Sequence, residues 1–296
     1  MLFSHRQGVL YLEHCRIQAS DGQLSLVRAQ DALERHWSIP HGNVCALLLG
    51  PGTSITHQAA HKLGEEQVML GFVGGGGAPL FFASQSEYRP TEYCQAWVSQ
   101  WADPGWRLHT AKQLAKARCA HVHLAYFKER LWEPSVETAL AEFSARIEEA
   151  STTEELLGFE ANFAKALYRF HADRAHRAFV REPRGADTTN GFIDSGNYLM
   201  YGLAASVLWV LGIPHAFPVT HGMTRRGALV FDLADVLKDA ILLPVAFDCA
   251  SEKVPAATHR ARCMAAIDKH DALKALFNVM KAVTFGKEPA DSKTTK

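Results

Sequence analysis

The residue pattern changes from strand-like to helical once, within residues 84–93 (SQSEYRPTEY), and this change most restricts the fold. Before it, short segments rich in β-branched, aromatic and leucine residues are separated by Gly, Asp-Gly and Pro-Gly turns, as in strands. After it, nearly every segment has helical periodicity, and Pro90 separates the two patterns. The sequence therefore predicts an α+β protein of two domains, a small N-terminal β-sandwich or folded sheet and a larger all-α domain.

Domain boundaries follow from the same pattern. We expect an N-terminal β-domain over residues 1–86, a linker over 87–91, a helical domain over 92–285 and a disordered polar tail over 286–296. One helix, TSITHQAAHKLGEE, interrupts the strands, with Thr53 or Ser54 as its N-cap. In the helical domain we expect one long helix from about Thr153 to Val180.

Composition excludes several classes of protein. The chain has 296 residues, 48% of them hydrophobic, and no net charge, so an anionic partner must be met by local basic patches. The most apolar run, Tyr198 to Pro214, is too short to span a bilayer. Six cysteines without a CxxC motif indicate reduced thiols, and the N-terminus lacks a signal-peptide pattern, so we expect a cytoplasmic protein.

The stretch HGMTRRGALVFDLADVLKD, from His221 to Asp239, concentrates more ionisable side chains than any other. A helix from about Leu229 would align Asp232, Asp235 and Asp239 along one face, at the edge of an apolar stripe. Because like charges repel, something cationic is expected beside them.

That cation has two interpretations. It is a divalent metal ion, for which an imidazole with carboxylates suits Mn²⁺ and tolerates Mg²⁺. Otherwise the neighbouring Arg225, Arg226 and Lys238 neutralise the carboxylates, and the stretch is a solvated acidic helix face.

A second carboxylate belongs to the long helix. Glu160 lies close to the apolar stripe formed by Leu156, Phe159, Phe163, Leu167 and Phe170. A carboxylate on a buried side is costly unless it is paired or binds a metal ion. Glu160 is therefore either a metal ligand or the partner of a core arginine, for which Arg174, Arg177 and Arg181 are candidates.

The end of this helix is basic. The stretch contains only two acidic residues, Asp173 and Glu182, against five arginines. The arginines are Arg169, Arg174, Arg177, Arg181 and Arg184. Such a run is a candidate contact with the phosphate backbone of DNA, where charge rather than base identity dominates binding. A solvated helix face is the alternative.

Several motifs in order resemble one known family. An LLGFEA helix, the segment TTNGFIDSGNYLMYGLAASVLWVLGIPH and the block HGMTRRGALVFDLADVLKDAILLPVAF resemble the CRISPR-associated integrase and endonuclease that acquires new spacers. The earlier segments HWSIPHGNVCALLLGPGTSIT, GFVGGGGAPLF and SQSEYRPTEY are similar to its subtype I-F members. The resemblance covers roughly residues 8 to 285.

This resemblance implies an enzyme, its assembly and its site. It implies a homodimer, with dimerisation assigned to the N-terminal β-domain, and one Mg²⁺ or Mn²⁺ ion in each helical domain. Matched motif by motif, the family's ligands fall on Glu160, His221 and Asp235, with Asp232 as an adjunct. Ala161 departs from the glycine found there in most of the wider family, a change that affects none of the ligands.

The resemblance implies that the enzyme joins protospacer 3′-OH ends to the CRISPR repeat by transesterification. Hydrolytic nicking is the same reaction with water as the nucleophile. Implied partners are protospacer and leader-repeat DNA and the small ferredoxin-like acquisition protein, fused in subtype I-F to the helicase-nuclease. We expect Arg225 and Arg226 to clamp phosphates. Lys238 and the run Arg174, Arg177, Arg181 and Arg184 are expected to contact the duplex.

Two other functions use the same residues. A general metal-dependent DNA nuclease would need Glu160, His221 and Asp235 but would not join strands. A non-catalytic DNA-binding assembly protein would instead hold the acidic cluster in salt bridges with Arg225 and Arg226.

Overall fold

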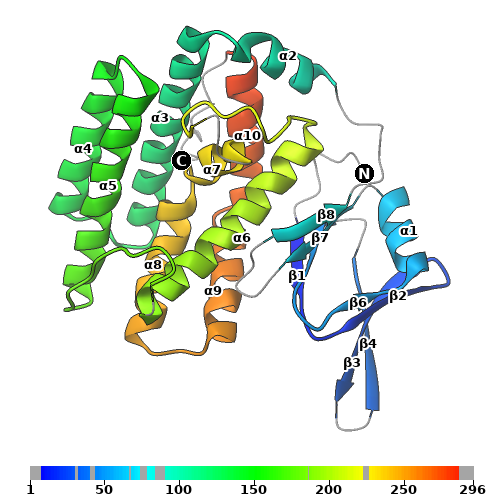
Figure 1. Cartoon of the computed structure of the whole chain (residues 1–296). Helices are drawn as coiled ribbons and strands as arrows, with labels where there is room; N and C mark the ends of the chain where they lie inside the picture. Colours follow the sequence, from blue (N-terminus) through cyan, green and yellow to red (C-terminus); the bar gives the residue numbers. More distant parts are fainter. Residues whose placement is uncertain are drawn as a thin grey trace, which may run out of the picture. The chain divides into compact units, whose positions relative to one another are not determined.

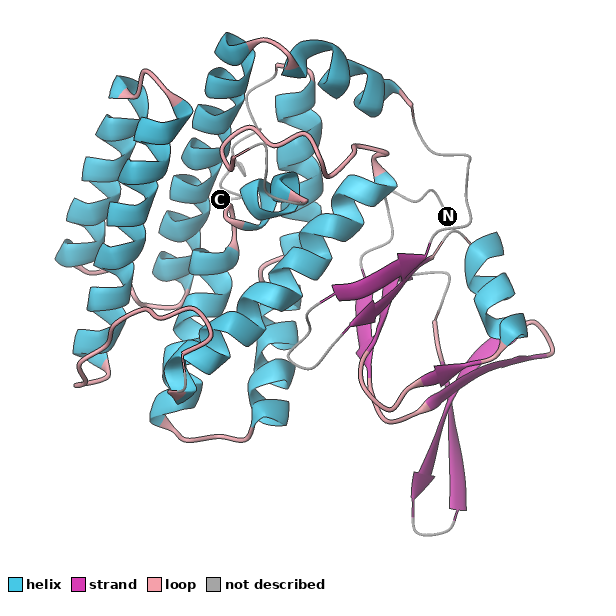
Figure 2. Cartoon of the chain, viewed as in Figure 1, coloured by secondary structure: helices cyan, strands magenta, loops and turns pink. Residues whose placement is uncertain are grey.

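The computed structural model describes residues 8–30, 33–40, 44–66, 68–73, 79–83, 91–185, 187–222 and 227–286. The chain divides into two compact units, residues 1–89 and 90–296, the first rich in strands and the second in helices (Figure 1, Figure 2). The expected α+β class is thereby confirmed. The expected linker, 87–91, and disordered tail, 286–296, fall outside the described residues except for Thr91 and Gly286.

Two four-stranded sheets form the first unit. One has the order β1-β5-β7-β8, parallel except for the last pair, and the other has the order β4-β3-β2-β6, antiparallel except for the short β6. The strands are β1 (Gly8–Leu12), β2 (Arg16–Ser20), β3 (Gln23–Gln30), β4 (Leu33–Ser38), β5 (Val44–Leu49), β6 (Ser54–Ile55), β7 (Met69–Val73) and β8 (Pro79–Ala83). A core that includes Ile17, Leu24, Leu47 and Leu63 joins both sheets to helix α1 (His57–Glu65).

The cap expected for α1 is wrong. Thr56 is the N-cap, and its hydroxyl accepts a hydrogen bond from the N–H of Ala59 at 3.3 Å. Ser54 instead belongs to β6, which pairs with β2 through backbone hydrogen bonds such as Ser54 N–H to Cys15 O at 2.9 Å. Ser54, which local propensity assigned to the start of the helix, is thus part of the sheet instead.

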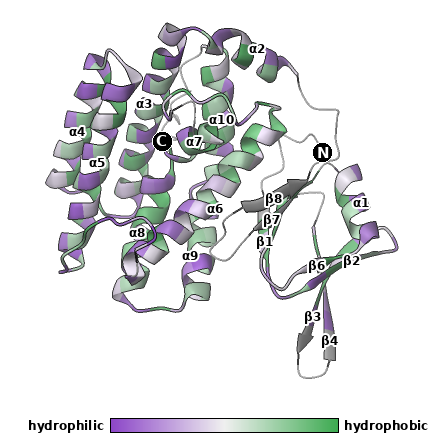
Figure 3. Ribbon diagram, in the orientation of Figure 1, coloured by the Kyte–Doolittle hydropathy of each residue, from purple (hydrophilic) through white to green (hydrophobic). Residues whose placement is uncertain are grey.

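Helices make up the second unit. They are α2 (Glu92–Trp101), α3 (Pro104–Lys128), α4 (Pro134–Glu149), α5 (Thr153–Arg174), α6 (Thr188–Val210), α7 (Ala228–Ala234), α8 (Lys238–Ser251), α9 (Ala256–Lys269) and α10 (Ala272–Thr284). Helix α4 packs on α5 and α3, while α6 packs on α7, α8 and α9. Figure 3 shows purple and green residues alternating along α4 and α5, as expected of amphipathic helices that cover a core. No helix within the described ranges is long and apolar enough to cross a membrane.

Helix α5 is shorter than the expected 153–180. Its start is fixed by a capping box, in which Thr152 Oγ1 accepts from the N–H of Glu155 and the Glu155 carboxylate accepts from the N–H of Ser151. It ends at Arg174 because His176 takes a left-handed backbone conformation, with φ of 50°. Residues beyond it therefore leave the helix as a loop.

The expected single helix across Asp232, Asp235 and Asp239 is also wrong. Helix α7 ends at Ala234, and the N–H groups of Val236 and Leu237 donate three residues back, to Leu233 and Ala234. Helix α8 then starts at Lys238. The break turns the three carboxylates toward different partners instead of aligning them, which reduces their mutual repulsion.

Candidate metal centre

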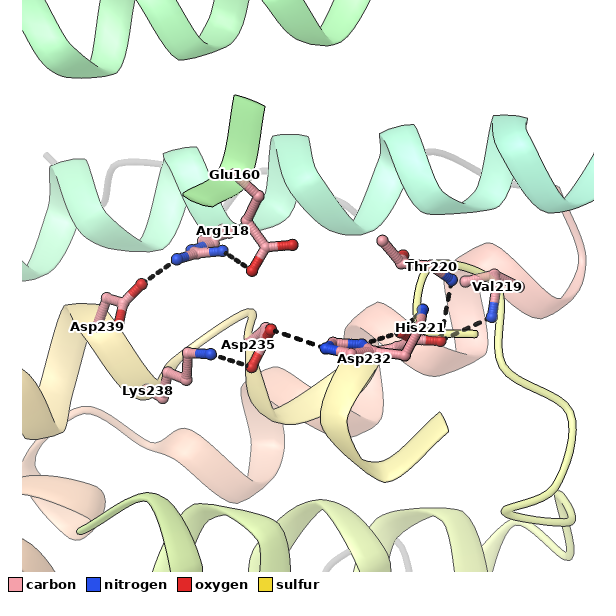
Figure 4. Close-up of polar contacts among 9 residues, drawn as sticks. All are labelled: Arg118, Glu160, Val219, Thr220, His221, Asp232, Asp235, Lys238 and Asp239. Carbon is pink, nitrogen blue, oxygen red and sulfur yellow. Dashed lines mark hydrogen bonds and ion pairs between the residues drawn. The ribbon is translucent and has the colours of Figure 1, made fainter. Parts of the chain in front are cut away.

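Side chains from α3, α4, α5, α7 and the loop before α7 surround one pocket of about 20 Å³, which is room for a single water-sized occupant. Glu160, His221, Asp232 and Asp235 are four of its lining residues, together with Arg118. Figure 4 shows Glu160 approaching from α5 and His221 and Asp235 from the opposite wall. The structure therefore brings together the four residues expected at the site.

Asp232 organises the loop that carries His221. Its buried carboxylate accepts hydrogen bonds from three successive backbone N–H groups, those of Val219, Thr220 and His221, at 2.7, 3.2 and 2.9 Å. Backbone donors that would otherwise be unpaired within the helical unit are thus satisfied by one side chain. Asp232 also lies 2.7 Å from His221 Nδ1, so it fixes both the loop and the ring.

This contact orients the imidazole of His221. With Nδ1 bound to Asp232, Nε2 points into the pocket and lies 3.9 Å from Asp235 Oδ2. Burial by itself lowers the pKa of His221, but the hydrogen bond to Asp232 and the nearby carboxylates outweigh it and raise the pKa.

Asp235 follows the last residue of α7 and is buried. The Nζ atom of Lys238 lies 2.5 Å from its Oδ1 as an ion pair, and His221 Nε2 lies 3.9 Å from its Oδ2. A buried carboxylate is costly unless it is paired, and Lys238 supplies this pairing. A cation that enters the pocket would share the Asp235 carboxylate with Lys238 or displace it.

Glu160 forms an ion pair with a buried arginine that was not among the partners expected from the sequence. Arg118 Nη1 lies 2.5 Å from Glu160 Oε1, and Arg118 Nη2 pairs with Asp239 on α8. Only 3% of the Arg118 side chain is exposed. Burial raises the pKa of Glu160, and the Asp235 carboxylate raises it further, against the lowering effect of Arg118.

A sequence signal for Arg118 exists in α3. Buried apolar residues recur at Ala111, Leu114, Val122 and Ala125, a helical stripe in which position 118 is the missing member. A cation in the middle of such a stripe predicts a buried charge with carboxylate partners. The candidate partners Arg174, Arg177 and Arg181 lie elsewhere, and none of them is found paired with Glu160.

The donor set fits a divalent metal ion, and both of its carboxylates are paired with cations of the chain itself. Within the described ranges, no three His, Cys, Asp or Glu side chains are close enough to hold an ion. In this state Lys238 engages Asp235 and Arg118 engages Glu160. One imidazole nitrogen and two carboxylates nevertheless form a set typical of Mn²⁺ and Mg²⁺ sites.

The expected DNA-contact residues fall in three places. Arg225 and Arg226 lie outside the described residues. Lys238 belongs to the buried cluster, with 17% of its side chain exposed. The run that starts at the end of α5 contacts other parts of the chain. Arg174 pairs with Glu133, Arg177 bonds to Thr189, Arg181 bonds to Asn190 and Asp194, and the N–H of Arg184 bonds to Asp194.

Known proteins match the chain over nearly all of its length. The family described as CRISPR associated protein Cas1 matches residues 9–264. The chain is 41% identical to a CRISPR-associated endonuclease Cas1 of Pseudomonas aeruginosa strain UCBPP-PA14 and 39% identical to one of Pectobacterium atrosepticum. Both matches cover 96% of this chain and 94% of the relative.

Solved structures share the fold at low identity. A Cas1 protein from Thermotoga maritima superposes with a TM-score of 0.75 at 15% identity, over 96% of this chain and 99% of that one. A TtCas1–DNA complex matches with a TM-score of 0.62 at 23% identity, over 94% and 96% of the two chains. A Cas6-RT-Cas1–Cas2 complex matches with a TM-score of 0.67 at 14% identity, over 98% of this chain and 36% of that one.

Proposed function

We propose, since the chain belongs to the Cas1 family of CRISPR-associated endonucleases, that Glu160, His221 and Asp235 hold one Mg²⁺ or Mn²⁺ ion for spacer integration. The proposal depends on one observation, that these three side chains converge on one pocket. Glu160 comes from α5, His221 from the loop before α7 and Asp235 from the end of α7. The chemistry of the set supports the proposal further, because one imidazole with two carboxylates suits both ions.

The reaction is a transesterification. The 3′-hydroxyl oxygen of a protospacer loses its proton and forms a bond to the phosphorus at the 5′ end of the repeat. The bond from that phosphorus to the 3′-oxygen of the preceding nucleotide breaks, which leaves that nucleotide with a free 3′-hydroxyl group. When bound, a divalent ion activates the attacking hydroxyl and stabilises the charge that develops on the phosphate. Hydrolytic nicking is the same exchange with water as the nucleophile.

The chain's own residues prepare the ligands. Asp232 holds Nδ1 of His221, which leaves Nε2 as the nitrogen that faces the pocket. It also holds three backbone N–H groups, so the loop before α7 keeps the ring in one orientation. Asp232 therefore acts through His221.

DNA contacts are a further part of the proposal. Arg225 and Arg226, close in sequence to His221, would clamp phosphate groups, since guanidinium forks bind phosphate oxygens in pairs. Lys238 would contact the duplex after release from Asp235. Of the run that starts at the end of α5, Arg174, Arg177 and Arg184 are exposed and can reach a phosphate backbone, whereas Arg181 is half-buried.

The proposed assembly follows the family. Structural neighbours include a Cas1–DNA complex and a complex that contains Cas1 and Cas2. For this chain we propose a cytoplasmic homodimer formed through the N-terminal β-domain. Its partners would be protospacer and leader-repeat DNA and the small ferredoxin-like acquisition protein fused to the helicase-nuclease.

Strand transfer tests the proposal. A labelled short duplex with 3′-OH ends is incubated with a plasmid that carries a leader and repeat, with the partner protein and with or without Mn²⁺ or Mg²⁺. Wild type is compared with Glu160→Ala and Asp235→Ala, and Glu154→Ala, an exposed carboxylate of the same helix α5, serves as the matched control.

We expect metal-dependent joining by wild type and Glu154→Ala, and none by Glu160→Ala or Asp235→Ala. Joining that survives both substitutions would mean that the metal ion is held elsewhere. Cleavage without joining would instead favour the general metal-dependent nuclease.

A further inference from the structure

Arg118 connects three helices at the floor of the pocket. From α3, it reaches Glu160 on α5 with Nη1 and Asp239 on α8 with Nη2. Its guanidinium carbon also lies 5.5 Å from the centre of the Phe163 ring. Each Nη atom thus faces a different carboxylate, so the planar fork bridges two helices that belong to different parts of the sequence.

Asp239 is itself firmly placed. It is buried near the start of α8, and Tyr126 of α3 donates to its backbone carbonyl at 3.4 Å. The Tyr126 hydroxyl also lies 2.7 Å from His171 Nε2 on α5. Burial lowers the pKa of His171 to about 3, so this end of the network is neutral. Asp239 is therefore a fixed anchor for the far side of the Arg118 fork.

Burial of Arg118 leaves one of its nitrogen atoms without a hydrogen bond, which has an energetic cost. Its Nε atom is buried and has no hydrogen-bond partner among the described side chains and backbone. The guanidinium thus makes its two close ion pairs through Nη1 and Nη2 and leaves its third nitrogen unsatisfied. The two ion pairs are thus the polar contacts that hold the guanidinium, and through them Arg118 affects the placement of two carboxylates.

We propose that Arg118 is a positioning residue, which ties Glu160 to Asp239 so that the Glu160 carboxylate faces His221 and Asp235 before a metal ion binds. This inference rests on the proposed role of Glu160 as a metal ligand. Arg118 itself touches neither metal nor DNA in this scheme. Its effect passes through the orientation of Glu160.

The sign of one measurement separates positioning from simple charge balance. A guanidinium beside a metal site repels the incoming ion, so removing its charge alone strengthens metal binding. If Arg118 orients Glu160, removing Arg118 weakens metal binding. The Glu160 side chain is then mobile in the metal-free protein, and ordering it reduces the free energy gained when the metal ion binds. The two roles therefore predict opposite changes in affinity.

The experiment measures Mn²⁺ binding to the full-length protein by electron paramagnetic resonance, without DNA. Wild type is compared with Arg118→Met, Arg118→Lys and Glu160→Gln. Lys116→Met is the matched control, because it removes one positive charge from the same helix at an exposed position. Circular dichroism melting confirms that each protein is folded, and Arg118→Lys retains the charge in case Arg118→Met does not fold.

We expect Arg118→Met and Arg118→Lys to bind Mn²⁺ about 10- to 100-fold more weakly, with Lys116→Met unchanged. The signal of bound Mn²⁺ should also broaden in both Arg118 variants as the ligand geometry becomes heterogeneous. Unchanged or stronger binding by a folded Arg118 variant would overturn the proposal. If wild type and Glu160→Gln bind Mn²⁺ alike, the metal site itself is refuted, and the role of Arg118 falls with it.

Discussion

Two charged regions of the helical unit use the same residue types in opposite ways. In the pocket, Glu160, His221 and Asp235 are gathered from separate segments, and the cations that meet them are themselves nearly buried. At the end of α5 and beyond it, the arginines lie close together in the sequence, and most are exposed or bonded to the start of α6. The carboxylates of the pocket line a space for one small occupant, whereas Arg181 in the run is bonded on both Nη atoms.

The comparison shows what a cluster of charges in a sequence leaves open. A charge that is fully paired with its own chain stabilises the fold, and a ligand must compete for it. Carboxylates and an imidazole that line one small pocket are better candidates for binding a cation. Partners in three dimensions, rather than density in the sequence, distinguish the two regions.

The largest effect is expected at Asp232, whose carboxylate serves three backbone N–H groups and the His221 ring. Asp232→Ala leaves these donors unpaired in a buried place, so we expect a loss of about 3 kcal/mol in the free energy of unfolding. For a unit of this size the melting temperature would fall by roughly 6 to 12 °C. Thermal melting followed by circular dichroism measures it.

Asp173→Ala is the control, because Asp173 is an exposed aspartate of α5. Its melting temperature should stay within about 2 °C of wild type. If Asp232→Ala melts like the control, the loop before α7 does not depend on this carboxylate, and the contrast between the buried pocket and the exposed run disappears.

Within the arginine run, Arg181→Ala and Arg174→Ala should differ in how much they lower the free energy of unfolding. Arg181 bonds to Asn190 Oδ1 at 2.8 Å and to Glu182 O at 3.0 Å and pairs with Asp194, so Arg181→Ala should cost about 1 to 3 kcal/mol. Arg174 forms an exposed pair with Glu133 at 3.0 Å, and Arg174→Ala should cost less than about 1 kcal/mol. Urea unfolding measures both, and equal losses would contradict the assignment of Arg181 to the fold.

Much of the fold was predictable from the sequence. The change of pattern at residues 84–93 was enough for the α+β class, because strand and helix periodicities differ over many residues. Element boundaries were less predictable. Ser54 joined a sheet through a partner strand distant in the sequence, and the break at Asp235 separated α7 from α8 inside a continuous amphipathic pattern. Both outcomes depend on tertiary contacts that outweigh local propensity.

The site residues were predictable as a set, but their partners were not. Motifs selected Glu160, His221, Asp232 and Asp235, and the structure brings these four to one pocket; their roles in binding a metal ion remain a prediction. Arg118 was missed because its signal, a cation within an apolar stripe of α3, points to burial without naming the partner. A pairing between residues of different helices, far apart in the sequence, has no local signature.

The pH dependence of metal binding sharpens the account of the pocket. In the metal-free protein the pKa of His221 is raised, so its pairing with Asp232 contributes stability that is fully present below about pH 6.5. This contribution is lost as the pH rises through the raised pKa. A metal ion needs the unprotonated Nε2, so its binding releases a proton.

We therefore expect Mn²⁺ affinity to rise with pH, by up to about tenfold per unit below the raised pKa of His221. Isothermal titration from about pH 5.5 to about pH 8 in buffers of different ionisation enthalpy measures both affinity and proton release. The slope should become smaller in His221→Ala, and the part that remains would come from Glu160, whose pKa is also raised. A wild-type affinity independent of pH over this range would exclude His221 as a ligand.

The smallest effect is expected at the exposed arginines of the run. Replacing Arg174, Arg177 and Arg184 together by Gln should weaken DNA binding and flatten its salt dependence, because each phosphate that an arginine neutralises adds about 0.9 to the slope. Arg146→Gln, another exposed arginine of this unit, is the control and should leave the slope unchanged. Fluorescence anisotropy with a labelled duplex at several salt concentrations measures it. A slope equal to that of wild type would show that these arginines form a solvated surface, and the DNA contacts would then be sought among the basic residues nearer the pocket.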